Sequence, residues 1–218
     1  MAIELPDYKL LLNMRKTYRD GNSCAFIGDI KFYGNIDMDL FKQETGFVTA
    51  DTFDVNGNPT HKLDLNNKLP EQFHDRYDWV IDSGSTHCCF DPSTVFENIL
   101  LMLKDKGCVF HTNGLAGFFG RAFYAFSPAL YRDFYNVNNF TIKHMATKTR
   151  DKNSGGSGDW KSIDPNHTYL NEHGDFADYD KYIPTIPNDW LINCFAVREN
   201  RVEFKKPVPQ HYVETKGK

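Results

Sequence analysis

The sequence contains no long apolar run and no cluster of positive charge. Its first residues, MAIELPDYKLLLNMRK, are too polar for a signal peptide or a membrane span. The 29 acidic residues exceed the 25 basic residues, the net charge is −4, and Lys205-Lys206 is only a pair. These absences argue against a membrane protein and against a nucleic-acid-binding protein.

Cysteine is scarce and irregularly spaced. The five cysteines are Cys24, Cys88, Cys89, Cys108 and Cys194. Three of them fall inside apolar, strand-like runs, which is typical of reduced core cysteines. The chain has 218 residues, of which 40% are apolar, so it can bury a substantial core. We therefore expect a cytoplasmic protein with one folded domain, and a homo-oligomer is compatible with the sequence.

Apolar runs alternate with helical patterns along the chain. The spacing of apolar residues predicts helices over 8–18, 38–45, 91–106 and 128–139. It predicts strands over 24–29, 47–51, 61–65, 77–82, 108–112, 140–149 and 189–200. Strands that alternate with helices favour an α/β fold with a mostly parallel sheet covered on both faces.

Two segments depart from this alternation. Residues 150–188 lack apolar periodicity and are rich in Gly, Asn, Asp and Tyr, which is typical of a long insertion or lid. Residues 201–218 are polar and contain two prolines, so we expect a tail that lies loosely on the surface. The single domain would then span residues 1–200.

Polar residues follow most of the predicted strands. They are Gly28-Asp29, Asp51, Asp64, Asp82 to Ser85, and Thr112-Asn113. Because the carboxyl ends of parallel strands meet at one edge of a sheet, ligands bind there. These residues are therefore the candidates for a binding site.

The loop GDIKFYG, from Gly28 to Gly34, is a poor match to the G-x-G-x-x-G pattern that cradles a diphosphate. Asp51 follows at roughly the twenty-residue distance at which an acidic residue meets ribose hydroxyls. A nucleoside cofactor without phosphates, such as S-adenosylmethionine, therefore fits better than NAD. The alternative is that Asp51 is only a turn residue.

The stretch YDWVIDSGSTHCCFDPS, from Tyr77 to Ser93, allows three interpretations. A zinc site is disfavoured, because His87, Cys88 and Cys89 are adjacent, whereas zinc ligands are usually about two to four residues apart. A thiol nucleophile would need an activating partner such as His111. The third interpretation, which we favour, is that residues 82–85 form the floor of a cofactor cleft.

Two blocks of the sequence, Leu63 to Asp91 and Phe123 to Phe134, resemble the class I S-adenosylmethionine-dependent methyltransferases. They follow the pattern D-L-N-x-P-L-P … F-D-x-V-I-D-x-G-T-L-E-H-V-F-D … H-G-F-Y-x-F-S-P, and the resemblance extends over about Cys24 to Phe140. It implies a Rossmann-like α/β fold with a mostly parallel seven-stranded sheet. The last strand of that sheet would be antiparallel, and residues 190–198 are its candidate.

The resemblance also implies a site for S-adenosylmethionine at the strand ends. Its residues would be Gly28, Asp29, Asp51, Asp64, Leu65, Asp82, Ser83 and Gly84. Asp51 would bind the ribose, with Asp54 as the rival if the strand is longer. Asp64 would accept a hydrogen bond from the adenine amine, and no metal is implied.

The chain departs from the family where the pattern shows a Glu-His pair. His87 and Cys88 stand at these positions, and Arg121 replaces the histidine before the second block. His87 is then the candidate base, with Asp82 as the second catalytic candidate. The candidate contacts to the acceptor are His111, Asn113, Arg121 and Tyr124.

The sequence therefore predicts a methyltransferase that acts on a hydroxyl or amine of a small molecule, for which a sugar is one candidate. The altered Glu-His pair keeps an alternative open, in which an inactive relative uses the same scaffold for binding or assembly.

Overall fold

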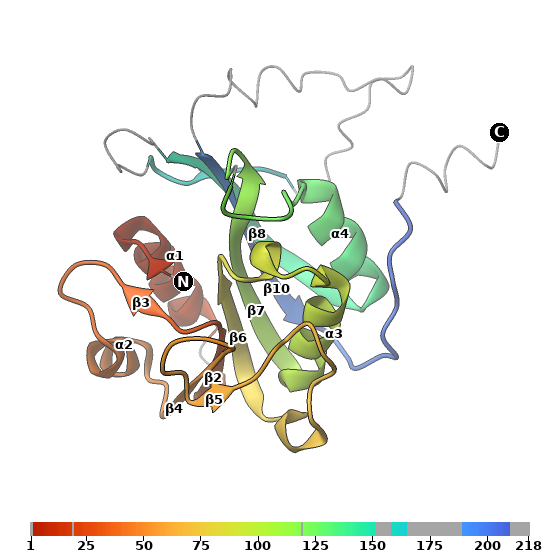
Figure 1. The fold of residues 1–218 in the computed structure, drawn as a ribbon, viewed down its shortest axis with the longest axis horizontal. Helices are drawn as coiled ribbons and strands as arrows, with labels where there is room; N and C mark the ends of the chain where they lie inside the picture. The colour runs from red at the N-terminus through yellow and green to blue at the C-terminus, as the bar shows by residue number, and fades with distance from the viewer. Residues whose placement is uncertain (1, 19, 119, 151–157, 165–188, 210–218) are drawn as a thin grey trace.

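The computed structural model describes residues 2–18, 20–118, 120–150, 158–164 and 189–209. An eight-stranded sheet runs through the centre, in the order β5-β4-β2-β6-β7-β10-β8-β9 (Figure 1). Its strands are β2 (Ser23–Ile27), β4 (Thr49–Asp54), β5 (His61–Lys62), β6 (Tyr77–Ser83), β7 (Leu103–Ala116), β8 (Phe140–Arg150), β9 (Lys161–Ser162) and β10 (Asp189–Arg198). None of the helices in these described ranges is long and apolar enough to cross a membrane.

The predicted Rossmann-like α/β fold is confirmed. Strands β5, β4, β2, β6 and β7 are parallel to one another, whereas β10 is antiparallel to both β7 and β8. The last strand is antiparallel, as expected, and it inserts between the two earlier strands β7 and β8. One strand exceeds the expected seven, because Lys161–Ser162 of the predicted insertion pairs with β8 at the sheet edge.

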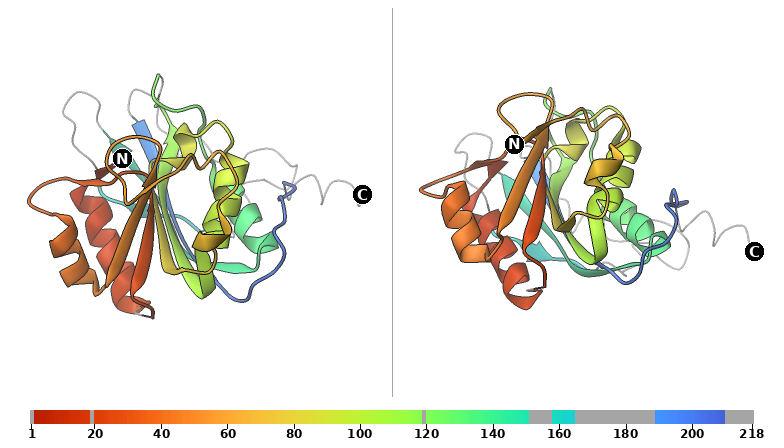
Figure 2. Two further views of the ribbon diagram at one scale, coloured as in Figure 1. Left: turned by 60° about the horizontal axis from the view of Figure 1, so that its bottom comes forward. Right: turned by 90° about the horizontal axis from the view of Figure 1, so that it is seen from below.

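Two helices cover each face of the sheet (Figure 2). Helices α1 (Leu5–Thr17) and α2 (Met38–Thr45) pack on one face through a cluster that includes Leu11, Phe41 and Phe110. Helices α3 (Pro92–Met102) and α4 (Pro128–Val137) cover the other face. Side-chain caps start three of the four helices, since Asp37, Asp91 and Ser127 accept backbone N–H groups at 2.8, 3.1 and 3.4 Å.

Helix α3 is shorter than the sequence predicts. It ends at Met102, and the chain passes directly into β7 instead of continuing to residue 106. Gly107 does not end the helix but allows a close approach within the strand. A Cβ there would lie 2.8 Å from Leu103 Cδ2 and 2.9 Å from the Lys104 carbonyl oxygen.

A small parallel sheet at the N-terminus is absent from the sequence predictions. It consists of β1 (Ala2–Ile3) and β3 (Lys31–Phe32). Ser83 Oγ, at the end of β6, donates a hydrogen bond to the Ala2 carbonyl oxygen at 3.1 Å. The first residues of the chain are thereby held over the carboxyl end of the large sheet.

The described part of the C-terminal tail is attached more firmly than expected. Asn138 exchanges two hydrogen bonds with the backbone of Lys205, at 2.9 and 2.9 Å. The Phe204 ring lies 6.2 Å from the Phe134 ring and packs on the core. Phe204 and Lys205 are therefore held by α4, whereas most residues of 201–209 are exposed and form no helix or strand. Residues 210–218 and most of the expected lid, 151–157 and 165–188, lie outside the described residues.

Candidate functional site

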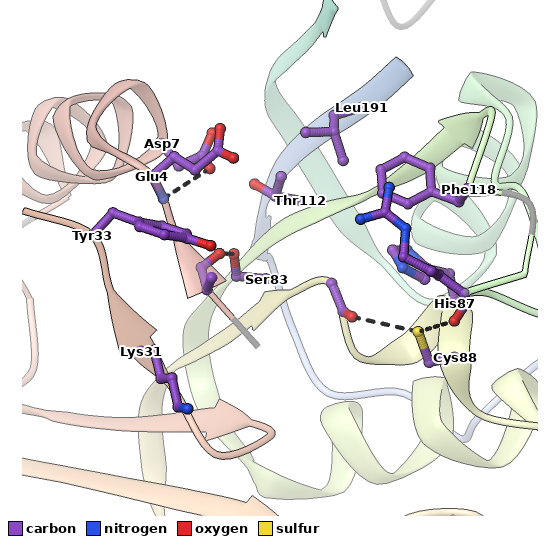
Figure 3. A pocket seen from close by; sticks show the side chains of 13 residues that line it. Glu4, Asp7, Lys31, Tyr33, Ser83, His87, Cys88, Thr112, Phe118 and Leu191 are labelled. Atoms are coloured by element: carbon purple, nitrogen blue, oxygen red, sulfur yellow. Dashed lines mark hydrogen bonds between the residues drawn. The ribbon is translucent and has the colours of Figure 1, made fainter. Parts of the chain in front are cut away.

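Two adjoining cavities lie at the carboxyl ends of the parallel strands. We call the first the aspartate cavity; its volume is about 350 Å³ and its lining includes Gly28, Asp54, Asp64 and Leu65. We call the second the N-terminal cavity; its volume is about 490 Å³. The residues that line it include Glu4, Asp7, Lys31, Tyr33, Ser83, His87, Thr112, Phe118 and Arg121 (Figure 3). Gly84 and Cys88 line both cavities and mark their junction.

The aspartate cavity combines two carboxylates with a glycine turn. Asp54, the last residue of β4, accepts backbone N–H groups of Asp29 and Asn56 at 2.7 and 3.0 Å. Asp64 accepts two hydrogen bonds from Asn66, at 2.9 and 2.8 Å. A carboxylate has about four acceptor positions, so both can bind further donors. Gly28, with φ 110°, leaves the backbone open to close approach by a ligand.

The placement expected for Asp51 is wrong. Strand β4 extends to Asp54, so Asp51 lies inside the strand and does not line the aspartate cavity. Its carboxylate accepts the Tyr77 hydroxyl at 2.6 Å and lies 3.4 Å from His61 Nε2. The position at the strand end belongs to Asp54, which was the rival.

Asp29 is also misplaced by the sequence prediction. Its carboxylate lies over the loop after β4 and accepts the backbone N–H of Asn58 at 3.2 Å. It lines neither of the two cavities. Gly57, with φ 72°, makes room for this carboxylate, because a Cβ there would lie 2.1 Å from Asp29 Oδ2.

Asp82 is a buried anchor and not a lining residue, in contrast to the sequence prediction. It has no exposed surface. Oδ1 accepts the N–H groups of Ser85 and Thr86 at 3.1 and 3.2 Å, and Oδ2 accepts from His111 Nδ1 and Asn113 Nδ2 at 2.9 and 2.7 Å. Burial opposes ionisation, but hydrogen bonds from His111, Asn113 and Thr86 lower the pKa of Asp82 to about 2. The charged side chain holds the turn that separates the two cavities.

His111 and Asn113 are buried like Asp82, so the contacts to a methyl acceptor that the sequence predicted for them are wrong. Both side chains are fully buried and point toward α4, where they contact Tyr135 at 2.5 Å and Tyr131 at 3.1 Å. Because side chains alternate along a strand, the residue between them, Thr112, lies on the opposite face and lines the N-terminal cavity.

His87 lines the N-terminal cavity, but its ring is not arranged as a base. The backbone N–H of Gly114 donates to His87 Nδ1 at 2.7 Å. Since an N–H can only donate, Nδ1 carries the lone pair and the neutral ring carries its proton on Nε2. Burial lowers the pKa of His87 and favours this neutral form. The Nε2 atom is therefore a donor, which corrects the expected role of His87 as proton acceptor.

We expect the stability of the wild type to fall as the pH decreases below the ordinary histidine pKa of 6.5, because the folded protein resists protonation of His87. His87→Asn keeps a hydrogen-bond acceptor near the position of Nδ1 and should reduce the loss of stability at low pH. His87→Ala should lower the free energy of unfolding by about 1–3 kcal/mol at neutral pH, because the Gly114 N–H loses its acceptor. Urea unfolding between pH 5 and 8 measures both effects. Burial also lowers the pKa of His144, and this contribution is the same in both proteins. Coinciding pH profiles for wild type and His87→Asn would therefore refute the assignment.

The two cysteines of the turn are neutral thiols. Cys88 Sγ lies 3.4 Å from the Arg121 carbonyl oxygen and 3.8 Å from that of Gly84. Burial raises the pKa of Cys88, and it raises the pKa of Cys89 to about 12. This disfavours a thiolate nucleophile. Within the described ranges, no group of three His, Cys, Asp or Glu side chains has the geometry of a metal site.

Arg121 and Tyr124 differ in their placement. Arg121 lines the N-terminal cavity and pairs with the buried Asp189, which also accepts the backbone N–H of Phe118 at 3.1 Å. Tyr124 does not line either cavity, because its hydroxyl donates to the Phe90 carbonyl oxygen at 2.9 Å. Its expected contact with an acceptor stays a prediction.

The acidic wall of the N-terminal cavity, formed by Glu4 and Asp7, is absent from the sequence predictions. Glu4 and Asp7 form a capping box at the start of α1. The pair does not have the usual Ser/Thr-x-x-Glu/Gln pattern, so the sequence gives no signal for it. Lys31 lies in β3 and Tyr33 follows it, and both line the cavity. They were not predicted because, among the described strands, the short β3 pairs with β1 and not with the central sheet.

Known proteins resemble this chain in structure and not in sequence. No protein-family model and no curated protein matches the sequence. A 1,6-didemethyltoxoflavin-N1-methyltransferase from Burkholderia thailandensis, solved with S-adenosylhomocysteine, has a TM-score of 0.52 and 10% identity over 88% of this chain and 78% of that chain. A candidate methyltransferase from Bacillus halodurans has a TM-score of 0.53 and 10% identity over 86% and 98%.

A third likeness is to a branched-chain polyamine synthase from Thermus thermophilus, with a TM-score of 0.52 and 14% identity over 95% of this chain and 60% of that chain. Proteins with different named activities thus share this architecture, so these structural similarities establish only the fold. The strand order with its inserted antiparallel β10 and these structural neighbours agree: the chain has the fold of the class I S-adenosylmethionine-dependent methyltransferases.

Proposed function

We propose that the chain binds S-adenosylmethionine in the aspartate cavity and transfers its methyl group to an oxygen or nitrogen of a small molecule in the N-terminal cavity. The observation that carries this proposal is the junction of the two cavities at Gly84 and Cys88. At such a junction, a reacting group from one ligand can meet a reacting group from the other.

The lining of the aspartate cavity fits the cofactor chemically. Asp54 accepts hydrogen bonds from hydroxyl donors of a ribose, and Asp64 with Leu65 suits an adenine ring and its amine. Gly28 and Gly84, with φ 110° and 92°, permit close approach by the backbone. These residues would hold S-adenosylmethionine without the phosphate-binding glycines that NAD requires.

The chain's contribution to the reaction is mainly positioning. When bound, S-adenosylmethionine supplies an electrophilic methyl group on a sulfonium, which reacts with an acceptor held in line. Transfer to an oxygen or nitrogen releases one proton. His87 is protonated on Nε2, so we assign it the role of a hydrogen-bond donor to the acceptor and expect the proton to leave to water.

Calorimetry with S-adenosylhomocysteine tests cofactor binding without knowledge of the acceptor. We expect the wild type to bind, and Asp54→Asn to weaken binding about tenfold, because the charged hydrogen bonds to the ligand are lost. Asp51→Asn is the matched control on the same strand and should leave the affinity unchanged. Absence of binding to the wild type contradicts the proposal, and equal loss in both variants contradicts the assignment of Asp54.

The second candidate is a catalytically inactive protein that keeps the cofactor cavity. The tautomer of His87 favours this candidate. Because Nε2 already carries a proton, this atom of His87 does not take up the proton that the methyl acceptor releases. Binding of S-adenosylhomocysteine together with no methyl transfer to a broad panel of alcohols, amines and sugars would support this candidate over the enzyme.

A further inference from the structure

One buried hydroxyl in the N-terminal cavity lacks a hydrogen-bond partner. Thr112 lines this cavity and is only 3% exposed, yet its Oγ1 atom makes no hydrogen bond to the described residues. Leaving a buried polar atom unpaired costs free energy, so such atoms usually bind a ligand or an ordered water. The unpaired hydroxyl therefore points to a polar group of a bound molecule.

A second unpaired oxygen lies beside it. Asn193 on β10 is directly opposite Thr112 on β7 in the strand register, so the two side chains lie on the same face of the sheet. Asn193 Nδ2 donates to the His111 carbonyl oxygen at 2.6 Å, while its Oδ1 atom is buried without a partner. This oxygen can only accept a hydrogen bond.

The neighbouring wall is also made of acceptors and already holds an ammonium group. Glu4 and Asp7 line the cavity, and both carboxylates accept from Lys148 Nζ, which is 3.2 Å from Glu4 Oε2. Figure 3 places Thr112 and Ser83 between this acidic pair on one side and His87 with Phe118 on the other.

We propose that the acceptor carries an amine, bound as an ammonium group by Thr112 and the Glu4–Asp7 wall. An ammonium group has three donors and no acceptor, which matches a wall of oxygens that accept hydrogen bonds better than a hydroxyl or a carboxylate does. This inference rests on the proposed function and deepens it. The ammonium group is the group that is recognised, and the methylated atom lies at the Gly84–Cys88 end of the cavity.

The cationic side chains that line the cavity are exposed. Lys31 is exposed, and the side chain of Arg121 is 54% exposed and pairs with Asp189. Solvent screens charges at such positions more than charges in the interior. We therefore expect the oxygens of the wall, and not these two cations, to determine which ligand binds.

Three probes that differ in a single group test this selectivity. Cyclohexylamine, cyclohexanol and cyclohexanecarboxylate would be titrated into the protein at pH 7.5, with and without S-adenosylhomocysteine, and followed by ligand-observed NMR. We expect the amine to bind about tenfold more tightly than the alcohol, and the carboxylate to bind most weakly. Equal binding of amine and alcohol overturns the proposal.

Variants of Thr112 distinguish recognition from a structural role. Thr112→Val removes an unpaired hydroxyl, so we expect its melting temperature to equal or exceed that of the wild type while the preference for the amine falls about tenfold. Thr112→Ser keeps the hydroxyl and should keep the preference. Thr147→Val, at a half-buried position on β8 outside both cavities, is the matched control. An unchanged preference in Thr112→Val contradicts the proposal.

Separate readouts keep this inference apart from the proposed function. If S-adenosylhomocysteine binds and the amine preference is absent, the amine proposal fails and the proposed function stands. If the amine binds selectively and S-adenosylhomocysteine does not bind, the proposed function fails and the selectivity of the cavity stands.

Discussion

Asp82→Ala should lower the free energy of unfolding by about 3–5 kcal/mol, because it removes the shared acceptor of a buried network. The donors left without a partner are the N–H groups of Ser85 and Thr86 and the side chains of His111 and Asn113. Urea unfolding at neutral pH measures this loss. Asp82→Asn keeps the size of the side chain but turns an amide donor toward these donors, so it should also be strongly destabilised.

Asp105→Asn is the control for the removal of a negative charge. Asp105 is exposed and accepts the backbone N–H of Arg201 at 3.0 Å, so the loss of its charge should cost less than about 1 kcal/mol. A similar loss for Asp82→Asn and Asp105→Asn would contradict the role of Asp82 as an anchor.

The same network predicts the pH dependence of stability in acid. The pKa of Asp82 is about 2 in the folded protein and 3.8 is its ordinary value, so the unfolded chain binds the proton first. The contribution of Asp82, about 2 kcal/mol, is therefore complete above about pH 4 and is lost as the pH falls toward 2. Asp82→Asn should lack this component in an acid titration of stability.

Lys148→Met should cost about 3–5 kcal/mol, because it leaves two carboxylates without their shared ammonium. The Lys148 side chain has no exposed surface and pairs with Glu4 and Asp7. Burial raises the pKa of Asp7, which Lys148 opposes. Thermal or urea unfolding measures the loss, and the acidic wall of the N-terminal cavity should loosen with it.

Lys143→Met, on the same strand, is the matched control. Lys143 lies 3.9 Å from Glu199 at the surface, where an ion pair contributes about 0–1 kcal/mol. Combining Lys148→Met with Asp7→Asn should recover part of the stability, since the substitution removes one of the unpaired charges. Equal effects of Lys148→Met and Lys143→Met would show that the buried pairs do not hold the N-terminal segment.

The sequence alone was sufficient for the alternation of strands and helices and for the mostly parallel central sheet, but not for β9 or for the small β1–β3 sheet. Local patterns carry that information: the apolar run at β6, the Asp-Pro start of α3 and the Ser-Pro start of α4 each depend on neighbouring residues. The same holds for the position of the Asp82–Gly84 turn, which follows a strand in a parallel sheet and therefore lies at its carboxyl edge.

The tertiary structure decided which of the polar residues at that edge face the cavities. Strand β4 ends at Asp54, so Asp54 and not Asp51 lines the aspartate cavity. Side chains alternate along β7, so Thr112 lines the N-terminal cavity while His111 is buried in the core. The role of His87 depends on a backbone N–H of Gly114, which is distant in the sequence. Strand register, side-chain face and hydrogen-bond partners arise only when separate segments pack together, so the sequence determined where the site lies and the packing determined which atoms form it.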